Sequence, residues 1–235
     1  MVSVDTVYQK VLALANKEQR GYITPQDFNL FANQAQMEIF EQYFYDTNVA
    51  RKNQGNDTVY ADVDDMLEEK LQIFENVDTI STTPAITDYY PDVPNRMYRI
   101  HEIYMKKFKA EILNTKDFNA CLNNGALIGP SARRPIANIK NNTISVSIGG
   151  IDLVTPTSIY YFRNPEKVNW TYVVINKQAM YDANLSTQDF ELHSSEENQL
   201  VNKILMLAGL ANQQPDIMKA GQGMDMATKQ QQPKI

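Results

Sequence analysis

The sequence of 235 residues contains one cysteine and two histidines. A single cysteine, Cys121, excludes an internal disulfide framework and a cysteine-based zinc site, and it is typical of a chain that folds in a reducing compartment. We expect it to be a small buried hydrophobic residue. The histidines, His101 and His193, stand far apart and in no metal-ligand spacing, so the sequence predicts no shared catalytic or metal-binding role for them.

Long apolar runs and concentrations of positive charge are also missing. No stretch of about 18 apolar residues is present to span a bilayer, and the first residues lack the basic start and unbroken apolar run of a signal peptide. We therefore expect a chain that is neither exported nor bound to a membrane. The formal net charge of −6 and the pI of about 5.0 argue against a dedicated nucleic-acid binder.

Patterns that carry catalysis are absent as well. The acidic run Asp62–Asp65 is a conceivable cation site, but acids ahead of an apolar helical stripe are what the helix dipole favours. The glycines of Gly221-Gln222-Gly223 lack the preceding strand, the following helix and the Lys-Ser/Thr pair of a phosphate loop. No serine occupies a nucleophile elbow, and no carboxylates are paired by a recognisable rule. We therefore predict no catalytic residues, no cofactor and no metal.

Three apolar stripes with helical spacing occupy residues 1–78. The first helix is expected from about 3 to 18, with Ser3 as N-cap, and its apolar positions are Val4, Val7, Tyr8, Val11, Leu14 and Ala15. The second starts at Thr24-Pro25-Gln26-Asp27, and its apolar face contains Phe28, Phe31, Ala32, Ala35, Ile39 and Tyr43. The third has Asp62, Asp64 and Asp65 at its N-terminus and ends near Asn76.

Residues 79–193 change to short runs rich in Tyr, Ile, Val and Thr, interrupted by prolines. The run Thr143–Ile148 alternates apolar and polar residues, and Gly149-Gly150 follows it as a turn signal. Further strands are expected at 97–105, 158–162, 170–175 and 189–192, with a short helix at 115–123. We therefore predict a β-rich insertion over 79–193.

A last helix is expected over 194–212. Ser194 and Glu197 have the spacing of a capping box, Gly209 marks the end, and the apolar face contains Val201, Ile204, Leu205 and Ala208. The fold class predicted is α+β, an antiparallel-type bundle of three N-terminal helices and one C-terminal helix. It carries the β-rich part as an insertion and ends in an extended or disordered tail over 213–235.

Two regions offer candidate contacts with partners. Arg133 and Arg134, between two prolines, form the most basic turn of the chain and could face DNA, an acidic neighbour or solvent; solvent or a protein neighbour is favoured. The tail has no apolar period of its own, so we expect it to dock on a neighbour as an arm. Its candidate contact residues are Ile217, Met218, Lys219, Met224, Met226 and Lys229.

Two segments, one near each end of the chain, carry a resemblance to a known family. The first covers residues 7–44 and centres on Gln19–Pro25, on Asp27-Phe28-Asn29 and on Ala32–Gln36, and the second covers residues 195–210. The first resembles the N-terminal segment, and the second the final helix, of structural proteins from crAss-like and related tailed phages of Bacteroidetes hosts. The β-rich part is unmatched.

This resemblance implies a virion component. Proteins of that family form dodecameric rings stacked below the portal and resemble the adaptors of short-tailed phages, and they supply no catalytic residues to carry over. It implies a head-to-tail connector in the virion neck or tail, assembled in the host cytoplasm. Its partners would be further copies of the chain, the portal, adjacent ring or tail proteins and, non-specifically, genomic DNA. The alternatives are a tail or tail-fibre-attachment subunit and, from another class, a small cytoplasmic enzyme.

Overall fold

The computed structural model describes residues 1–17, 23–52, 58–82, 87–88, 97–105, 107–123, 129–140, 143–149, 155–176, 178–211, 219, 222–223 and 226. Five α-helices and three small sheets in these ranges make this a mixed α+β protein, as predicted. The chain divides into two compact units, which we name the helical unit (1–73 with 165–235) and the β unit (74–164). The predicted β-rich part, 79–193, is longer than the β unit because residues 165–193 pack with the helices.

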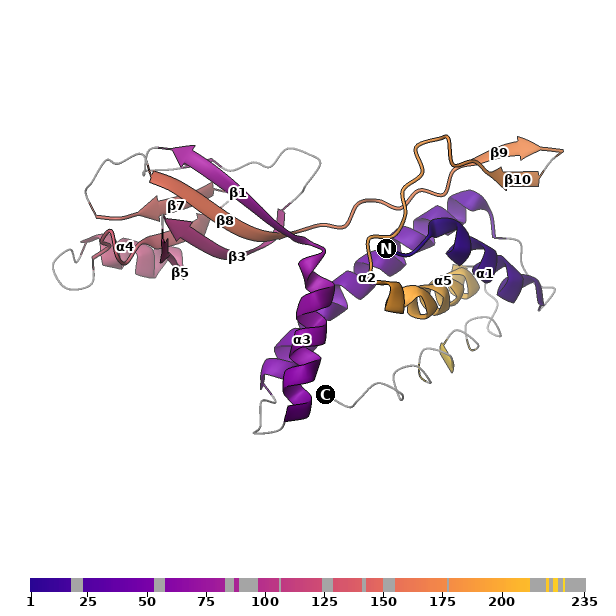
Figure 1. Cartoon of the computed structure of the whole chain (residues 1–235), viewed down its shortest axis with the longest axis horizontal. Helices are drawn as coiled ribbons and strands as arrows, with labels where there is room; N and C mark the ends of the chain where they lie inside the picture. Colours follow the sequence, from indigo (N-terminus) through magenta and orange to yellow (C-terminus); the bar gives the residue numbers. More distant parts are fainter. Residues whose placement is uncertain are drawn as a thin grey trace. The chain divides into compact units, whose positions relative to one another are not determined.

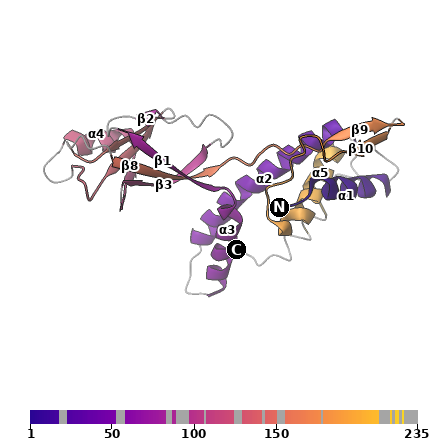
Figure 2. The ribbon, with the colours of Figure 1, turned by 45° about the horizontal axis from the view of Figure 1, so that its top comes forward.

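The helical unit contains four of the helices (Figure 1). These are α1 (Val4–Lys17), α2 (Pro25–Lys52), α3 (Thr58–Gln72) and α5 (Glu197–Ala211), the last preceded by the short 3₁₀ helix η1 (Ser194–Glu196). Helix α5 packs against α1 and α2, and α3 packs against α2 (Figure 2). The C-terminal helix therefore returns to the N-terminal helices, as the sequence predicted.

Side-chain caps start the first two helices where the sequence placed them. The backbone N–H of Thr6 donates to Ser3 Oγ at 3.5 Å, at the start of α1. At the start of α2, Asp27 N–H donates to Thr24 Oγ1 at 3.1 Å, and the Thr24 hydroxyl donates to Asp27 Oδ2 at 2.5 Å. Pro25 follows as the first helical residue, where its missing N–H costs no hydrogen bond.

The buried face of α2 follows the predicted stripe except at Phe31. Phe28, Ala32, Ala35 and Ile39 are fully buried, whereas Phe31 is only half-buried. The reason is that the buried stripe also takes in Gln36, Phe40 and Thr47, which shifts its centre away from Phe31. Along α1 the predicted face is buried apart from Leu14, which is half-buried.

Three predicted helix boundaries are wrong. Helix α3 begins at Thr58, so the acids of Asp62–Asp65 lie beyond its first turn and do not start it. It ends at Gln72 because strand β1 (Glu75–Thr82) takes the following residues into a sheet. At η1 the N-cap is His193 rather than Ser194, since its ring Nδ1 accepts from the N–H of Ser195.

Helix α5 ends close to the predicted bound at 212, since its last described residue is Ala211. The stop signal expected at Gly209 is wrong, because Gly209 is buried inside the helix, which continues for two more residues.

Two asparagines on α2 hold an extended segment that runs alongside the helix. Asn33 Nδ2 donates to the carbonyl of Val168 at 2.9 Å, and its Oδ1 accepts from the N–H of Val168 at 2.9 Å. Asn29 makes the same two hydrogen bonds with Trp170. Its Nδ2 donates to the Trp170 carbonyl at 3.2 Å, and its Oδ1 accepts from the Trp170 N–H at 2.8 Å. Each side-chain amide therefore satisfies both backbone groups of one residue, as a neighbouring strand would.

Gln36 completes this series, which we name the amide ladder (Asn29, Asn33 and Gln36). Its Nε2 donates to the carbonyl of Glu166 at 2.8 Å, and its Oε1 accepts from the N–H of Glu191 at 3.2 Å. Four residues of helix advance about 6 Å and two residues of strand about 6.6 Å, so the ladder spacing matches alternate residues of an extended chain. This geometry explains why a buried face of α2 carries amides.

The β unit contains two of the three sheets. In order across the first sheet lie β1, β8 (Thr155–Arg163), β3 (Met97–Met105) and β4 (Phe108–Lys109), all antiparallel. In order across the second lie β2 (Thr87–Asp88), β7 (Thr143–Ser147), β6 (Ile136–Lys140) and β5 (Glu111–Leu113), with β5 and β6 parallel. Helix α4 (Thr115–Asn123) connects β5 to the β6 side and packs on both strands.

The core of the β unit lies between its two sheets. Ile103, Met105, Ile159 and Tyr161 come from the first sheet and pack in one cluster with Ala110, Ala137, Ile144, Val146 and Ile148. Gly149 ends this layer with φ of 75°, and a Cβ there would lie 2.2 Å from the carbonyl oxygen of Pro130. Only glycine fits, which confirms the predicted turn at this position.

The strand predictions have mixed outcomes. Those for 97–105 and 158–162 and the helix at 115–123 are confirmed, while the strand at 170–175 starts at Tyr172. No strand forms at 189–192, where Phe190 makes only an isolated bridge with Val2. Cys121, expected to be buried, is half-buried on α4.

We predict unequal effects for two phenylalanines of α2. Phe28→Ala should lower the free energy of unfolding of the helical unit by about 3–5 kcal/mol, because it opens a cavity at a fully buried ring. Phe31→Ala should cost about half of that or less, since its ring is only half-buried. Urea denaturation followed by Trp170, the single tryptophan, measures both. Equal losses in the two variants would contradict the burial described here.

Candidate assembly surfaces

The third sheet is a hairpin that lies at an outer edge of the helical unit (Figure 1). Strand β9 (Tyr172–Ile175) pairs antiparallel with β10 (Gln178–Tyr181), and Ile175 faces Gln178 across the turn. Asn176 in this turn has φ of 51°, the left-handed conformation that two-residue hairpin turns require and that asparagine tolerates. In the described part of the chain no third strand joins this sheet.

An aromatic cluster fixes the base of the hairpin. Trp170 is fully buried, with its ring centroid 3.9 Å from that of Tyr8. The rings of Tyr172 and Tyr181, one from each strand, stack on Trp170 at 5.7 and 6.0 Å. The indole Nε1 donates to Asp5 Oδ1 at 3.0 Å, which satisfies the polar atom of the buried ring. The hairpin is therefore presented from a rigid base.

The rest of the hairpin exposes apolar side chains on both faces. Val173, Val174, Ile175 and Met180 are 42%, 63%, 50% and 53% exposed, and we name these four the hairpin surface. Successive strand residues point to opposite faces, so Val173 and Val174 place apolar groups on the two sides. Residues 172–181 contain one charged residue in sequence, Lys177. A two-stranded apolar hairpin with little charge and open edges is typical of a protein-contact surface.

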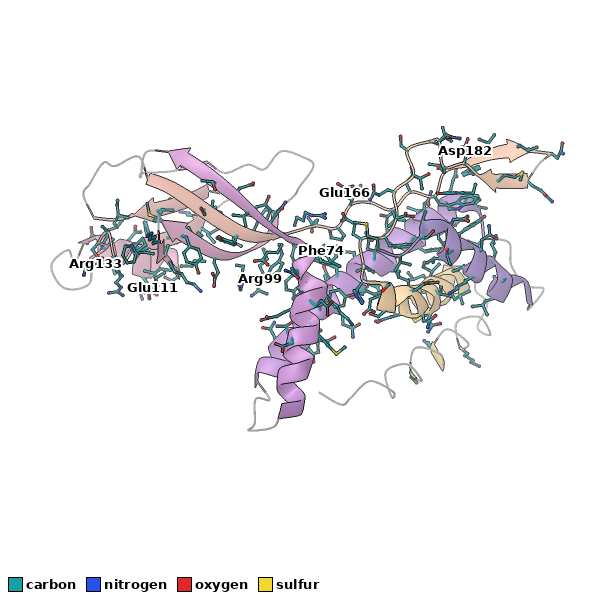
Figure 3. The ribbon with its side chains drawn as sticks, in the orientation of Figure 1. Phe74, Arg99, Glu111, Arg133, Glu166 and Asp182 are labelled. Carbon is teal, nitrogen blue, oxygen red and sulfur yellow. The ribbon has the colours of Figure 1, made fainter. Side chains whose placement is uncertain are left out.

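The basic turn predicted from sequence lies in the β unit. Arg133 is exposed, and Arg134 donates to Glu111 Oε2 at 3.0 and 3.3 Å across a half-exposed pair. Ser131 and Arg134 close the turn with reciprocal backbone hydrogen bonds of 3.1 and 3.0 Å. Figure 3 places Arg133 and Glu111 at the end of the β unit away from Phe74. Of the two predicted arginines, only Arg133 is left without an ion pair among the described residues.

Most of the predicted tail contacts lie outside the described residues. These are Ile217, Met218, Met224 and Lys229. Lys219 and Met226 are described, and both are exposed. Their backbones are helical, as are those of residues 222 and 223, where the sequence predicted an extended or disordered chain.

The two histidines lie in different units of the chain and have different partners. His101 of the β unit is exposed, with Nε2 3.9 Å from Glu102 Oε1, whereas His193 of the helical unit caps η1. Within the described ranges, no group of three or more His, Cys, Asp or Glu side chains could hold a metal ion. No helix among the described residues is long and apolar enough to cross a membrane.

A nearly buried ion pair ties α3 to the start of α5. Lys70 Nζ lies 2.6 Å from Glu196 Oε1, and the two side chains are 15% and 4% exposed. The same ammonium group lies 5.6 Å from the ring centroid of Tyr43. Burial and the nearby Glu196 carboxylate raise the pKa of Tyr43 well above its usual range, so its hydroxyl stays neutral. The ion pair of Lys70 and Glu196 is structural, because it joins two elements in a nearly buried position.

The hairpin surface was missed at the sequence level. Residues 170–175 were predicted as a strand, but Gln178–Tyr181 was not recognised as its partner. The signal was available, because Asn176 begins a two-residue turn between two runs that are rich in apolar and aromatic residues. The exposure of these side chains was not predictable, since the same pattern is typical of a core strand.

Glu102 provides a pH-dependent prediction. Hydrogen bonds from Lys109 and then Tyr104 lower the pKa of its carboxyl group, so Glu102 stabilises the fold above its usual pKa and loses this effect as pH falls through the lowered value. Glu102→Gln should therefore reduce the free energy of unfolding at pH 7 by about 0.5 kcal/mol. The difference from wild type should shrink below about pH 4.

Urea denaturation followed by far-ultraviolet circular dichroism measures this effect at each pH. Glu111→Gln is the matched control, since the Glu111 side chain is 50% exposed, against 21% for Glu102, and its pair with Arg134 should contribute little. A Glu102→Gln deficit that is the same at pH 3 and pH 7 would contradict the role assigned to the carboxylate.

The chain matches no protein-family model and no curated protein. Its function is therefore inferred from the surfaces described above and from the chain's own sequence.

Proposed function

We propose that this chain is a non-enzymatic structural subunit of a tailed-phage virion, forming a dodecameric ring below the portal that joins the capsid to the tail and lines the DNA tunnel. The observation that carries the proposal is the hairpin surface, four exposed apolar side chains held on a rigid aromatic base. The resemblance of residues 7–44 and 195–210 to ring proteins of crAss-like phages supports the same reading.

Exposing the hairpin surface to water is energetically unfavourable, and this supports an assembly that buries it. A soluble monomer gains nothing from exposing Val174 and Ile175 on a two-stranded sheet, and open strand edges promote association with other chains. Burying these side chains against a neighbouring copy of the chain removes them from water and gives the edge strands a partner. We assign the hairpin surface to the contact between neighbouring copies in the ring.

The charge balance supports a DNA tunnel. The chain has a formal net charge of −6, so the inside of a ring made from it repels phosphates on average. A tunnel of this kind lets DNA pass without the strong, salt-dependent binding that clustered cations produce. The proposed partners are further copies, the portal, and adjacent ring or tail proteins, in the virion neck or tail and in the host cytoplasm during assembly.

The proposal includes a finer description of the fold. The four helices of the helical unit form one antiparallel-type bundle, the β unit is carried as an insertion between α3 and α5, and residues 213–235 act as an arm toward a neighbour. The packing of α5 on α1 and α2 supports the bundle. The exposed side chains of Lys219 and Met226 support the arm.

Mass photometry of the purified chain, with and without its portal, tests the proposal. Twelve copies of the 26.8 kDa chain should appear as a species of about 320 kDa, and electron microscopy should show it as a closed ring. The double substitution Val174→Thr with Met180→Thr keeps β-propensity but adds polarity, and it should abolish this species without lowering the melting temperature.

The matched control is Tyr45→Gln with Leu210→Gln, which removes similarly exposed apolar groups from helices α2 and α5. This control should assemble as wild type does. A wild-type chain that stays monomeric with its portal present would refute the proposed function. If the double variant at Val174 and Met180 assembled as wild type does, the hairpin surface would not be part of the interface between copies.

A further inference from the structure

The two units of the chain carry opposite charge. Residues 74–164 hold ten Lys and Arg and eight Asp and Glu, so the β unit has a formal net charge of +2. The rest of the chain holds twelve Lys and Arg and twenty Asp and Glu, so the helical unit has a formal net charge of −8. A subunit polarised in this way favours contacts between unlike units of neighbouring copies.

Three exposed cations of the β unit lie in turns or at the start of its helix. Lys107 lies in the turn between β3 and β4, Lys116 in the first turn of α4, and Arg133 in the turn before β6. All three side chains are exposed, and within the described residues none of them forms an ion pair. We name these three residues the basic end.

The topology of the β unit places Lys107 away from the unit's connections to the rest of the chain. Strand β1 starts directly after Phe74, and β8 ends directly before Asn164, so both connections lie at one end of the first sheet. Strand β3 is antiparallel to β8 and therefore finishes at the opposite end, about 25 Å away, where Lys107 follows it. Figure 3 shows Arg133 at that far end and Phe74 at the near one.

Helix α3 of the helical unit supplies a surface of complementary charge. Asp65 and Glu69 are one helical turn apart and exposed, whereas Leu67 and Leu71 are buried. Lys70 follows Glu69 in the chain, and its ammonium group is paired with Glu196. We name Asp65 and Glu69 the acidic face of α3.

We propose that the basic end of the β unit docks on the acidic face of α3 in a second copy of this chain. The inference rests on the proposed function and deepens it, because a ring requires two different faces on each subunit that meet head to tail. The basic end supplies one such face and α3 the other. The hairpin surface adds apolar area to the contact between copies.

A protein partner fits the basic end better than DNA does. The carboxylates of Glu102 and Glu111 lie among the cations, paired with Lys109 and Arg134, so the surface alternates in sign. A duplex presents an unbroken row of phosphates, which these carboxylates would repel. The acidic face of α3 presents two separate carboxylates instead of an unbroken row of negative charge, so it suits a surface of alternating sign better than a duplex does.

Charge reversal tests the contact. The basic-end variant carries Lys107→Glu and Arg133→Glu, and the acidic-face variant carries Asp65→Lys and Glu69→Lys. Each alone should raise the concentration of chain needed for half-maximal assembly by on the order of tenfold, because like charges then meet across the interface. An equimolar mixture of the two variants should assemble within about threefold of wild type, since alternating copies restore opposite charges at every contact.

The matched control carries Lys140→Glu with Lys167→Glu, the same charge change at exposed lysines that are not part of the basic end, and should assemble as wild type does. All variants alter exposed residues, and their melting temperatures check folding. Mass photometry measures assembly, and fluorescence anisotropy of a labelled duplex measures DNA binding.

Loss of assembly in each variant with recovery in the mixture supports the inference. Unchanged assembly, or loss without recovery in the mixture, overturns it while leaving the proposed ring intact. Loss of duplex binding in the basic-end variant with unchanged assembly also overturns it and assigns the basic end to DNA. Failure of the wild-type chain to assemble, alone or with its portal, overturns both the inference and the proposed function.

Discussion

The helical unit depends on the hydrogen bonds by which amide side chains of α2 hold an extended segment beside it. Segment 166–170 has no strand partner for Glu166 and Val168 in the described residues, yet its backbone groups are partly removed from water. Unpaired buried backbone groups cost about 1–3 kcal/mol each. The amide ladder avoids this cost, because side chains from one face of α2 hydrogen-bond these backbone groups. The same hydrogen bonds fix both the position and the direction of the segment.

This constraint connects the interior of the unit to its surface. Holding Trp170 by its backbone places the indole against Tyr8, and Trp170 in turn stacks against Tyr172 and Tyr181 at the hairpin base. The hairpin surface is thus fixed by contacts that begin on α2. The positions Asn29, Asn33 and Gln36 of this helix have a physical role in the fold, independent of any partner.

Local signals explain what could be predicted from the sequence. Thr24, Pro25 and Asp27 form a start signal within four residues, and 143–148 alternates with a glycine behind it, so α2 and β7 follow from neighbours in the chain. The amide ladder was not predictable in this way. An asparagine on a helix is ordinarily a surface residue, and its role here is set by a segment about 135 residues away.

Strand β1 was missed for the same physical reason. Its residues Glu75–Thr82 lack a clear alternation, and they form a strand because β8, far along the chain, offers an edge. Strands β5 and β6 are parallel and are connected through α4, so no short turn in the sequence predicts that they pair. Arg133 could be singled out from the sequence because it lies in the most basic turn of the chain, between two prolines. The acidic face of α3 and the exposure of the hairpin were not predictable in this way, because they depend on which side chains the fold buries.

Hydrogen exchange at the backbone amides of Val168 and Trp170 tests the central role of the amide ladder most directly. The account predicts that both amides exchange as slowly as the interior of α2, because Asn33 and Asn29 accept their hydrogens at 2.9 and 2.8 Å. In an Asn33→Leu variant, exchange should accelerate at Val168 first and then across Tyr172–Ile175. Fast exchange of Val168 and Trp170 in the wild-type chain, at the rate of an exposed loop, would contradict the account.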